Sequence, residues 1–259
     1  MNVYILTLFP GMFSPVVNTS IIKRAQEQGL VRIKTVDVRG FAQDAHKTVD
    51  DYLYGGGPGM VLKPEPVFEA VDWVKQELGR QPFVVLLTPQ GQTLTAGLAR
   101  ELAHKPDLVL ISGHYEGFDE RIRCLADIEV SIGDYVLTGG ELAAMVVLDA
   151  SIRFVPGVLG DSDSALQDSF SDGLLEGPQY TRPAEYRGLK VPDILLTGRH
   201  EDITRWRRKE AIRRTLRRRP ELLKVADLTF EDRCLLEQVI NEEKANEARG
   251  DNRGRNQTN

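Results

Sequence analysis

The sequence predicts an α/β fold with a mostly parallel sheet, followed by a small helical domain. In the first part of the chain, short apolar runs of strand length alternate with segments of helical periodicity, which is typical of parallel strands joined by helices. Glycine-bearing loops follow three of these predicted strands, and charged helix-forming stretches dominate beyond residue 173. These observations predict an α/β domain over 1–155, a linker over 156–173, a helical domain over 174–248 and a disordered tail over 249–259.

The composition is that of a globular protein and excludes several other classes. The chain has 259 residues, of which 41% are hydrophobic and 27% are charged. No run approaches the roughly 20 apolar residues that a membrane span needs. The first ten residues lack a basic leader, so we expect a first strand there and not a signal peptide. Cys124 and Cys234 lie far apart without metal-ligand spacing, which favours two structural thiols in a reducing cytoplasm.

The first third of the chain contains one unusual segment. Strands are predicted over 3–8 and 31–38, on either side of a helix that ends at Gly29. The following segment, 39–63, is long and irregular, and its YGGGPGM stretch has too many glycines for regular structure. We expect a lid or a phosphate cradle there, and the alternative is a mobile surface loop. Neither of the two common nucleotide-binding glycine patterns is present.

The next hundred residues repeat one pattern, in which a strand, a loop with glycine and a helix follow one another. Apolar runs predict strands over 83–87, 108–111 and 128–132. Helical spacing predicts helices over 64–78, from the N-cap Thr95 to about residue 104, over 118–126 and over 141–154.

Three loops close these strands: TPQG (88–91), SGHYEG (112–117) and SIGDYVLTGG (131–140). In open α/β sheets, ligands bind outside the carboxyl ends of the strands, where these loops are expected to cluster. Paired glycines let the backbone approach a ligand closely. The topology therefore predicts one site built from three loops, and the alternative is that they are ordinary β–α connections.

Few charged side chains lie in this predicted pocket. Glu116 follows Tyr115 in a glycine-flanked loop, where its carboxylate could accept hydrogen bonds from the amide and amine edge of a ligand. The alternative is an acid favoured by a helix N-terminus. His114 has a similar pair of interpretations, as a ligand contact or a solvated loop residue, and Asp134 is compatible with a simple turn.

Asp168 and Arg153 are candidates for acid–base chemistry. Asp168 is one of several acids in the predicted linker, but its neighbours Leu166 and Phe170 could anchor the segment by packing. A carboxylate that is desolvated when such a segment closes is a credible general base. Arg153, at the end of the preceding helix, could orient an anion; the alternative is a partner of the helix C-terminus.

The charge is strongly uneven along the chain. The net charge is −5, yet residues 199–219 contain ten Lys and Arg against three Asp and Glu, a local balance of +7. Four cations, at Arg205, Lys209, Arg213 and Arg217, form one row at i, i+4 spacing, with Trp206 beside them. This pattern predicts an anion-binding face suited to nucleic acid. The alternative is a solvated face that pairs with acids elsewhere.

The motifs YGGGPGM, TPQG, GHYEG, SIGDYVLTGGE, RFVPGVLG, QDSF and PQYTRP occur in this order. On these motifs the chain resembles, up to about residue 245, the bacterial tRNA (guanine-N1)-methyltransferase (TrmD) family of the SPOUT class. The resemblance implies an α/β domain with a C-terminal trefoil knot, and methylation of N1 of guanine 37 in the anticodon loop of tRNA, which prevents frameshifts. It also implies a cytoplasmic homodimer with shared active sites.

The resemblance also assigns roles to individual residues. S-adenosylmethionine would be bound by residues of the three loops: Leu87, Pro89, Gly91, Gly113, Gly117, Ile132, Gly133, Asp134, Tyr135, Val136, Leu137 and Gly140. Asp168 would be the general base, contributed by the partner chain, and Arg153 would support it. Guanine contacts would come from Glu116 and Tyr115, and the tRNA stem would be held by Arg205, Lys209 and Arg213. Mg²⁺ is implied as well, although the sequence has no dedicated ligand cluster for it.

Two rival functions remain open at this point. The first is a non-catalytic RNA-binding regulator, which would need neither Asp168 nor the glycine-rich loops. The second is a SPOUT enzyme that methylates another RNA position or a ribose oxygen. A ribose methyltransferase would be expected to use an Arg or a Ser/Thr, so the aspartate of the QDSF motif disfavours that alternative.

Overall fold

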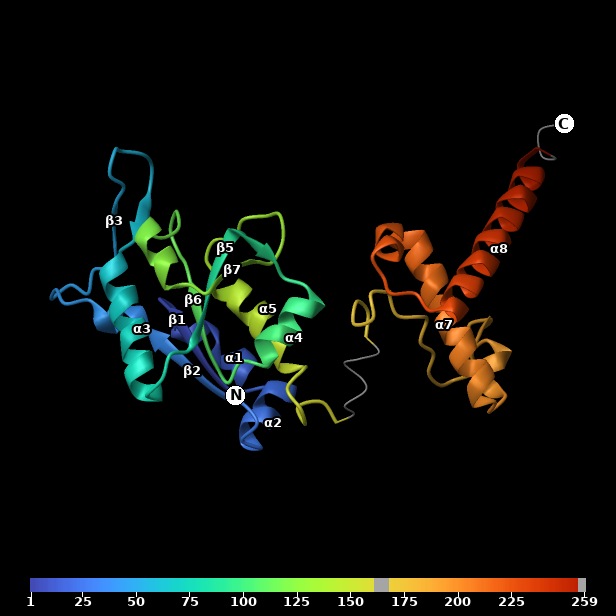
Figure 1. Cartoon of the computed structure of the whole chain (residues 1–259), viewed down its shortest axis with the longest axis horizontal. Coiled ribbons are helices and arrows are strands. Elements are labelled where there is room, and N and C mark those ends of the chain that lie inside the picture. Colours follow the sequence, from blue (N-terminus) through green and yellow to red (C-terminus); the bar gives the residue numbers. More distant parts are fainter. Residues whose placement is uncertain (161–167, 256–259) are drawn as a thin grey trace. The chain divides into compact units, whose positions relative to one another are not determined.

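The computed structural model of the chain describes residues 1–160 and 168–255. The chain divides into two compact units, Met1–Ala165 and Leu166–Asn259 (Figure 1). The division falls within the segment 156–173 that the sequence predicts to be a linker. Each unit has its own hydrophobic core and is described by itself.

A five-stranded sheet forms the centre of the first unit. Its order is β2-β1-β6-β5-β7, and its four pairings are all parallel, so the predicted mostly parallel sheet is confirmed for the described residues. The strands are β1 (Asn2–Thr7), β2 (Arg32–Asp37), β5 (Phe83–Thr93), β6 (Asp107–Ser112) and β7 (Ile128–Ser131).

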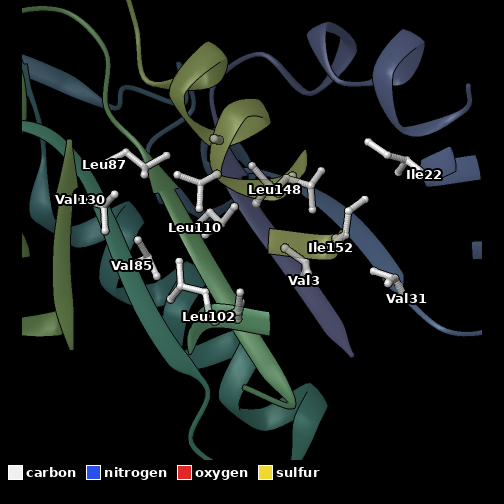
Figure 2. Packing of buried hydrophobic residues seen from close by; sticks show 14 of the residues in the cluster. Val3, Ile22, Val31, Val85, Leu87, Leu102, Leu110, Val130, Leu148 and Ile152 are labelled. Atoms are coloured by element: carbon white, nitrogen blue, oxygen red, sulfur yellow. The ribbon is translucent and has the colours of Figure 1, made fainter. Parts of the chain in front are cut away.

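Helices cover both faces of this sheet, and two buried clusters result. The helices are α1 (Ser14–Val17), α2 (Ser20–Glu27), α3 (Pro64–Leu78), α4 (Ala96–Ala103) and α5 (Glu141–Ile152), with short 3₁₀ turns η1 (Pro10–Met12), η2 (Val38–Phe41) and η3 (Glu120–Leu125). One cluster joins Leu110 of β6 to Leu102 of α4 and Leu148 of α5 (Figure 2). The other places Val109 and α3 on the opposite face. Successive residues of a strand point to opposite faces of the sheet. Because helices cover both faces here, the strands are continuous apolar runs.

Strand β5 is longer than the sequence predicts. The TPQG stretch was expected to end the strand at residue 87, but β5 continues to Thr93. Its pairing with β7 is irregular between Leu87 and Gln92. Because Pro89 has no N–H to donate, the ladder cannot run through it without a local bulge. The stretch is therefore an irregular interruption within the strand, with Leu87 before it and Gln92 after it both paired to Val130.

Three other predictions about local structure also need correction. The expected helix over 118–126 is the 3₁₀ turn η3, which Asp119 caps by accepting the N–H of Arg121. The expected helix over 141–154 ends at Ile152. The segment 39–63 is not wholly irregular, since β3 (Asp50–Tyr52) and β4 (Met60–Leu62) form an antiparallel hairpin around the glycines.

The second unit consists mainly of two long helices with a small hairpin. Its elements are β8 (Glu185–Tyr186), β9 (Leu189–Lys190), the 3₁₀ turn η4 (Asp193–Leu196), α7 (His200–Arg218), the 3₁₀ turn η5 (Pro220–Lys224) and α8 (Phe230–Arg255). The core joins Ile212 of α7 to Leu235 and Val239 of α8, with Leu174 from the preceding segment. Helix α8 extends to Arg255 and so overlaps the tail 249–259 for which the sequence predicts disorder.

The described ends of the predicted linker each pack on their own unit. Val158 is buried in the core of the first unit, and the N–H of Phe170 bonds to the carbonyl oxygen of Leu174 in the second, at 2.7 Å. Leu166, which was expected to anchor the segment, and two other acids of the predicted linker, Asp161 and Asp163, lie outside the described residues. Within the part of the chain that is described, no helix is both long enough and apolar enough to cross a membrane.

Candidate active site

The carboxyl ends of β5, β6 and β7 lie at one edge of the sheet, because the three strands are parallel and adjacent. The predicted methyl-donor residues are therefore brought together in this unit. Strand β5 contributes Leu87, Pro89 and Gly91, the loop after β6 contributes Gly113 and Gly117, and the loop after β7 contributes 132–137 and Gly140. Leu87 is buried in the hydrophobic core of this unit (Figure 2).

The loops after β6 and β7 are joined by their backbones. The N–H of Gly140 donates to the carbonyl oxygen of Gly113 at 2.7 Å. A Cβ on Gly140 would lie 2.7 Å from the Gly113 nitrogen and 2.9 Å from the Cα of Ser112. Strand β5 separates β6 from β7 in the sheet, so the loop after β7 must cross the end of β5 to reach this position. Glycine is needed at 140 because the two backbones touch.

A second close approach joins β5 to β7. A Cβ on Gly91 would lie 2.5 Å from both the Glu129 carbonyl carbon and the Val130 nitrogen. The loop that follows β7 is held by its own bonds: the Tyr135 hydroxyl donates to the Ile132 carbonyl oxygen at 3.2 Å, and its N–H donates to that of Gly133 at 2.9 Å. The side chains of Asp134, Tyr135 and Val136 are exposed. This loop is therefore held by its own bonds and presents exposed side chains as well as backbone groups.

The loop that carries Glu116 is bonded to strand β4. The N–H of Glu116 donates to the Met60 carbonyl oxygen at 3.0 Å, and the N–H of Leu62 donates to that of Gly117 at 2.9 Å. A Cβ on Gly59 would lie 2.4 Å from the Cγ of Glu116. The YGGGPGM stretch thus lies directly beside Glu116. Its glycine density drew attention to it in the sequence, but nothing there predicted this contact.

Tyr115 adopts a left-handed conformation, with φ of +61°, which a non-glycine residue rarely takes. Its ring lies 5.0 Å from that of His114, edge to face. Strained backbone of this kind persists where the surroundings fix it, and it is frequent at binding sites. The predicted substrate residues Tyr115 and Glu116 therefore share a tightly constrained turn.

A buried carboxylate that sequence reasoning missed lies behind these loops. Glu141, the first residue of α5, accepts a hydrogen bond from the hydroxyl of Thr7 at 2.8 Å. Its other oxygen lies 3.9 Å from Nδ1 of His114. The only indication in the sequence was an acid directly after two glycines at a helix start, which is also the ordinary place for one.

The two predicted catalytic residues belong to different units. Arg153 is half-buried and lies at the C-terminal end of α5 in the first unit. Asp168 is half-buried in the second unit, and its carbonyl oxygen accepts the N–H of Ser171 at 3.2 Å. Asp168 lines an open groove of about 930 Å³ there, together with Tyr180, Arg182 and residues of α7.

The predicted basic row on α7 is paired with acids of α8. Lys209 Nζ lies 2.6 Å from Oε1 of Glu242, and Arg213 Nη2 lies 2.5 Å from Oε2 of the same carboxylate. Arg217 makes two 2.8 Å hydrogen bonds to Glu243. These hydrogen bonds hold the pKa of each glutamate below its usual value. The like charges of the row are thus compensated within the unit, as the alternative interpretation required.

Arg208 makes an ion pair with a buried carboxylate in the second unit. Its Nε and Nη2 donate to the two oxygens of Asp232 at 2.6 and 3.0 Å, and the Asp232 side chain is buried. These bonds lower the pKa of Asp232 to about 2. The pair fixes α7 to the start of α8 and is structural. Among the described residues, no group of three or more His, Cys, Asp or Glu side chains is placed to hold a metal ion.

Comparison with known proteins identifies the family of the chain. Residues 1–225 match the family described as tRNA (Guanine-1)-methyltransferase TrmD. Proteins named tRNA (guanine-N(1)-)-methyltransferase are 60% identical in Geobacillus kaustophilus, over 88% of this chain and 94% of the relative, and 56% identical in Anoxybacillus flavithermus, over 92% and 98%. A relative with the same name in Moorella thermoacetica is 54% identical over 94% and 98%. The chain therefore belongs to the tRNA (guanine-N1)-methyltransferase (TrmD) family.

Proposed function

We propose that this protein transfers a methyl group from S-adenosylmethionine to N1 of guanine 37 in tRNA. The observation that carries the proposal is the meeting of three glycine-bearing loops at one sheet edge, in a chain that belongs to this family. The match covers nearly the whole length of each of the three relatives, all named tRNA (guanine-N(1)-)-methyltransferase.

The methyl donor is bound in this proposal by the backbone of the three loops. Gly140 and Gly91 have backbone in the space where a Cβ would stand, so these loops lie against one another with little side-chain bulk. Gly133 and Gly117 have φ of +148° and +118°, which turns the chain sharply at the edge. S-adenosylmethionine supplies an electrophilic methyl carbon on its sulfonium. The adenine and methionine parts are recognised by amide and carbonyl groups of 132–137 and by Pro89.

The protein's own part in the chemistry is to remove a proton and to stabilise charge. N1 of guanine carries a proton and is a poor nucleophile until that proton is lost. Asp168 takes the N1 proton as general base while the methyl group moves in line from sulfur to nitrogen. Arg153 stabilises the negative charge that develops on O6 of the guanine, and Glu116 accepts from its N–H edge. Holding both substrates at attack distance supplies much of the acceleration.

The active site is shared between two copies of the chain in this proposal. Arg153 and Glu116 belong to one unit and Asp168 to the other, which is compatible with their coming from different chains. Helix α5 also carries an apolar face suited to an interface. Leu142 and Val146, one helical turn apart, are 49% and 45% exposed. Burial of this face would stabilise a dimer next to the loops.

A trefoil knot in the first unit belongs to the same proposal. Two observations support it: the loop after β7 passes the end of β5 to bond Gly113, and α5, which follows that loop, packs in the core against α4 and β6. Knots are rare among protein folds, so the proposal rests on these contacts and on the family.

The second unit is proposed to grip the tRNA through α7. Arg205 lies 3.7 Å from Glu231 of α8, and Lys209 and Arg213 share Glu242, so each cation exchanges a carboxylate partner for a phosphate when it binds tRNA. Such an exchange makes binding sensitive to salt. Arg207 and Arg182 line the same groove as Asp168, and in this proposal they contact phosphates of the bound tRNA.

Mg²⁺ has no dedicated cage among the described residues, and no step above is assigned to it. Mg²⁺ is commonly held by one or two carboxylates together with substrate phosphates. A cytoplasmic location is proposed from the tRNA substrate and from Cys124 and Cys234, which are both free thiols.

The test is methyl transfer from labelled S-adenosylmethionine to two tRNA transcripts, one with G36 and G37 and one with G37 replaced by A. We expect transfer to the first transcript alone. The Asp168→Ala variant should bind the donor but lose transfer, and turnover at the wild-type rate would contradict its role as base. Transfer to both transcripts would move the target position. Donor binding without transfer to either would favour the RNA-binding regulator.

A further inference from the structure

A buried carboxylate stands at the point where three distant parts of the chain meet. Glu141 is 2% exposed, and its Oε1 accepts from the hydroxyl of Thr7, at the end of β1, at 2.8 Å. The Thr7 hydroxyl also accepts the N–H of Phe9 at 2.9 Å, so it is fixed as the donor toward Glu141. Burying a carboxylate is unfavourable unless it is hydrogen-bonded, and the helix N-terminus adds further stabilisation.

The second oxygen of this carboxylate faces an imidazole. Glu141 Oε2 lies 3.9 Å from Nδ1 of His114, which is beyond hydrogen-bond length. That nitrogen is buried and has no hydrogen-bond partner among the described residues. The His114 ring packs against the rings of Phe9, at 4.8 Å, and Tyr115, at 5.0 Å. A polar atom is therefore held next to the carboxylate by ring packing.

The two loops of the donor site cross at this pair. His114 forms an isolated antiparallel bridge with Gly139. A Cβ on Gly139 would lie 2.4 Å from Oε2 of Glu141 and 2.6 Å from Nδ1 of His114. The side chains of Glu141 and His114 therefore fill the space above Gly139, directly beside the bond from Gly140 to Gly113.

We propose that Glu141 is a positioning residue for the methyl donor, with Thr7 and His114 as the groups that orient it. Its carboxylate holds the turn 113–117 and the turn 139–140 in one arrangement, so that their backbone groups face the donor without reorganisation on binding. Groups fixed in advance bind more tightly because less freedom is lost. The inference rests on the proposed function, since it places the donor at these loops.

A role confined to stability would have different consequences. Loss of a purely structural bond would lower the melting temperature and leave donor affinity unchanged well below that temperature. Loss of a positioning group weakens donor binding under conditions where the variant is fully folded. The Thr7 side chain offers a matched pair of substitutions: Thr7→Val removes the hydroxyl at nearly constant shape, whereas Thr7→Ser keeps it.

The experiment measures the dissociation constant of S-adenosylmethionine by calorimetry for the full-length protein, at a temperature where melting curves show each variant to be folded. We expect Thr7→Val, which loses the hydrogen bond to the carboxylate, and Glu141→Gln, which loses its charge, each to bind the donor roughly tenfold more weakly. Thr7→Ser should restore wild-type affinity. Glu101→Gln, an exposed acid on α4, is the control and should match the wild type.

Each outcome bears on the inference. Unchanged donor affinity in both Glu141→Gln and Thr7→Val would overturn it and leave the proposed function intact. A wild-type protein that does not bind the donor would overturn the proposed function and the inference together. If Glu141→Gln fails to fold, the Thr7 pair decides: equal affinity for Val and Ser at position 7 would contradict the positioning role.

Discussion

The backbone N–H of Gly140 and the carbonyl oxygen of Gly113 are 2.7 Å apart, and this bond joins two loops whose strands are not neighbours in the sheet. The contact is between main chains, so its sequence requirement is the absence of a side chain. A third strand, β5, ends between the two loops. The proposed donor site is thus an edge where three strand ends are held by backbone bonds.

Substitution of Gly140 by alanine should disrupt this edge. The new Cβ would lie 2.7 Å from the Gly113 nitrogen, and backbone cannot move aside as a flexible side chain does. We expect a loss of about 1–3 kcal/mol in the free energy of unfolding, with weakened binding of S-adenosylmethionine. Chemical denaturation and calorimetry would measure the two effects.

Gly97→Ala is the matched control, because Gly97 lies within α4 and the nearest atom to a Cβ there is the Thr95 Oγ1 at 3.7 Å. Alanine should stabilise that helix by up to about 1 kcal/mol and leave donor binding unchanged. If the two variants have equal stability and equal donor affinity, the close backbone contact between Gly140 and Gly113 does not constrain the loops.

A second pair of glycines separates backbone strain from contact with Glu116. Gly59 and Gly56 have φ of +80° and +81°, so alanine is strained to the same degree at both. At Gly59 the Cβ would also lie 2.4 Å from the Cγ of Glu116, whereas at Gly56 nothing lies within 4 Å. Gly59→Ala should displace the Glu116 carboxylate.

The expected result is a fall of roughly ten- to a hundredfold in kcat/KM for tRNA with Gly59→Ala, as small misplacements of a substrate group produce. Gly56→Ala should keep most of the wild-type value. Single-turnover methyl transfer would measure both variants. The same loss in both would assign the effect to the hairpin backbone, and Glu116 would lose its proposed contact with guanine.

Much of the fold was predictable because its causes are local in sequence. Strands buried on both faces are continuous apolar runs, and the Val85 and Leu110 strands were recognised in this way. The β3–β4 hairpin was missed because each strand has only three residues around a glycine-rich turn. The continuation of β5 beyond Pro89 depends on its pairing with β7, which no local pattern reveals.

Replacing Arg205, Lys209 and Arg213 with glutamine should weaken tRNA binding and flatten its dependence on salt. The slope of log K against log salt should fall by about 1 for each cation that contacts a phosphate. Glu242→Gln is the informative companion, because it removes the carboxylate that pairs with Lys209. Lys209 is then free to bind a phosphate, so this variant should bind tRNA more tightly. Filter binding at several salt concentrations would measure both effects. Unchanged tRNA affinity in the triple variant would mean that these cations only pair with the acids of α8 and do not bind tRNA.

The Arg208–Asp232 pair predicts an acid-dependent loss of stability in the second unit. The pKa of Asp232 is lowered from 3.8 to about 2 in the folded state, chiefly by the hydrogen bonds from Arg208. A carboxyl whose pKa is lower in the folded state than in the unfolded state stabilises the fold fully at a pH above its unfolded pKa. That stabilisation is lost as the pH falls through the folded pKa. The contribution, about 2 kcal/mol, should therefore disappear between pH about 4 and about 2.

Trp206 fluorescence in a Trp73→Phe background would follow the second unit, since these are the two tryptophans of the chain. Urea unfolding should show Asp232→Asn to be less stable than its parent above pH 4, with the difference shrinking toward pH 2. Glu237→Gln, at an exposed position of α8, is the control and should show no such change. A difference independent of pH would exclude the proton-linked origin.

The glycine-bearing loops of the candidate site could be predicted from the sequence, whereas the buried hydrogen bond between Thr7 and Glu141 behind them could not. Glycines mark the loops of the site directly in the sequence, so Gly113 and Gly140 could be named in advance. Thr7 and Glu141 lie 134 residues apart in the chain, and their hydrogen bond depends on the sheet order. A lone threonine at a strand end and an acid at a helix start each have an ordinary explanation, so their joint role becomes visible only in three dimensions.

The most direct test of the central claim is the identity of the methylated nucleoside. The wild-type protein, S-adenosylmethionine and an unmodified tRNA transcript with G36 and G37 would be incubated, and the RNA digested to nucleosides for chromatography and mass spectrometry. We predict 1-methylguanosine, absent when G37 is replaced. A methyl group on N2, N7 or a ribose oxygen would contradict the account, because Asp168 is proposed to remove the proton from N1.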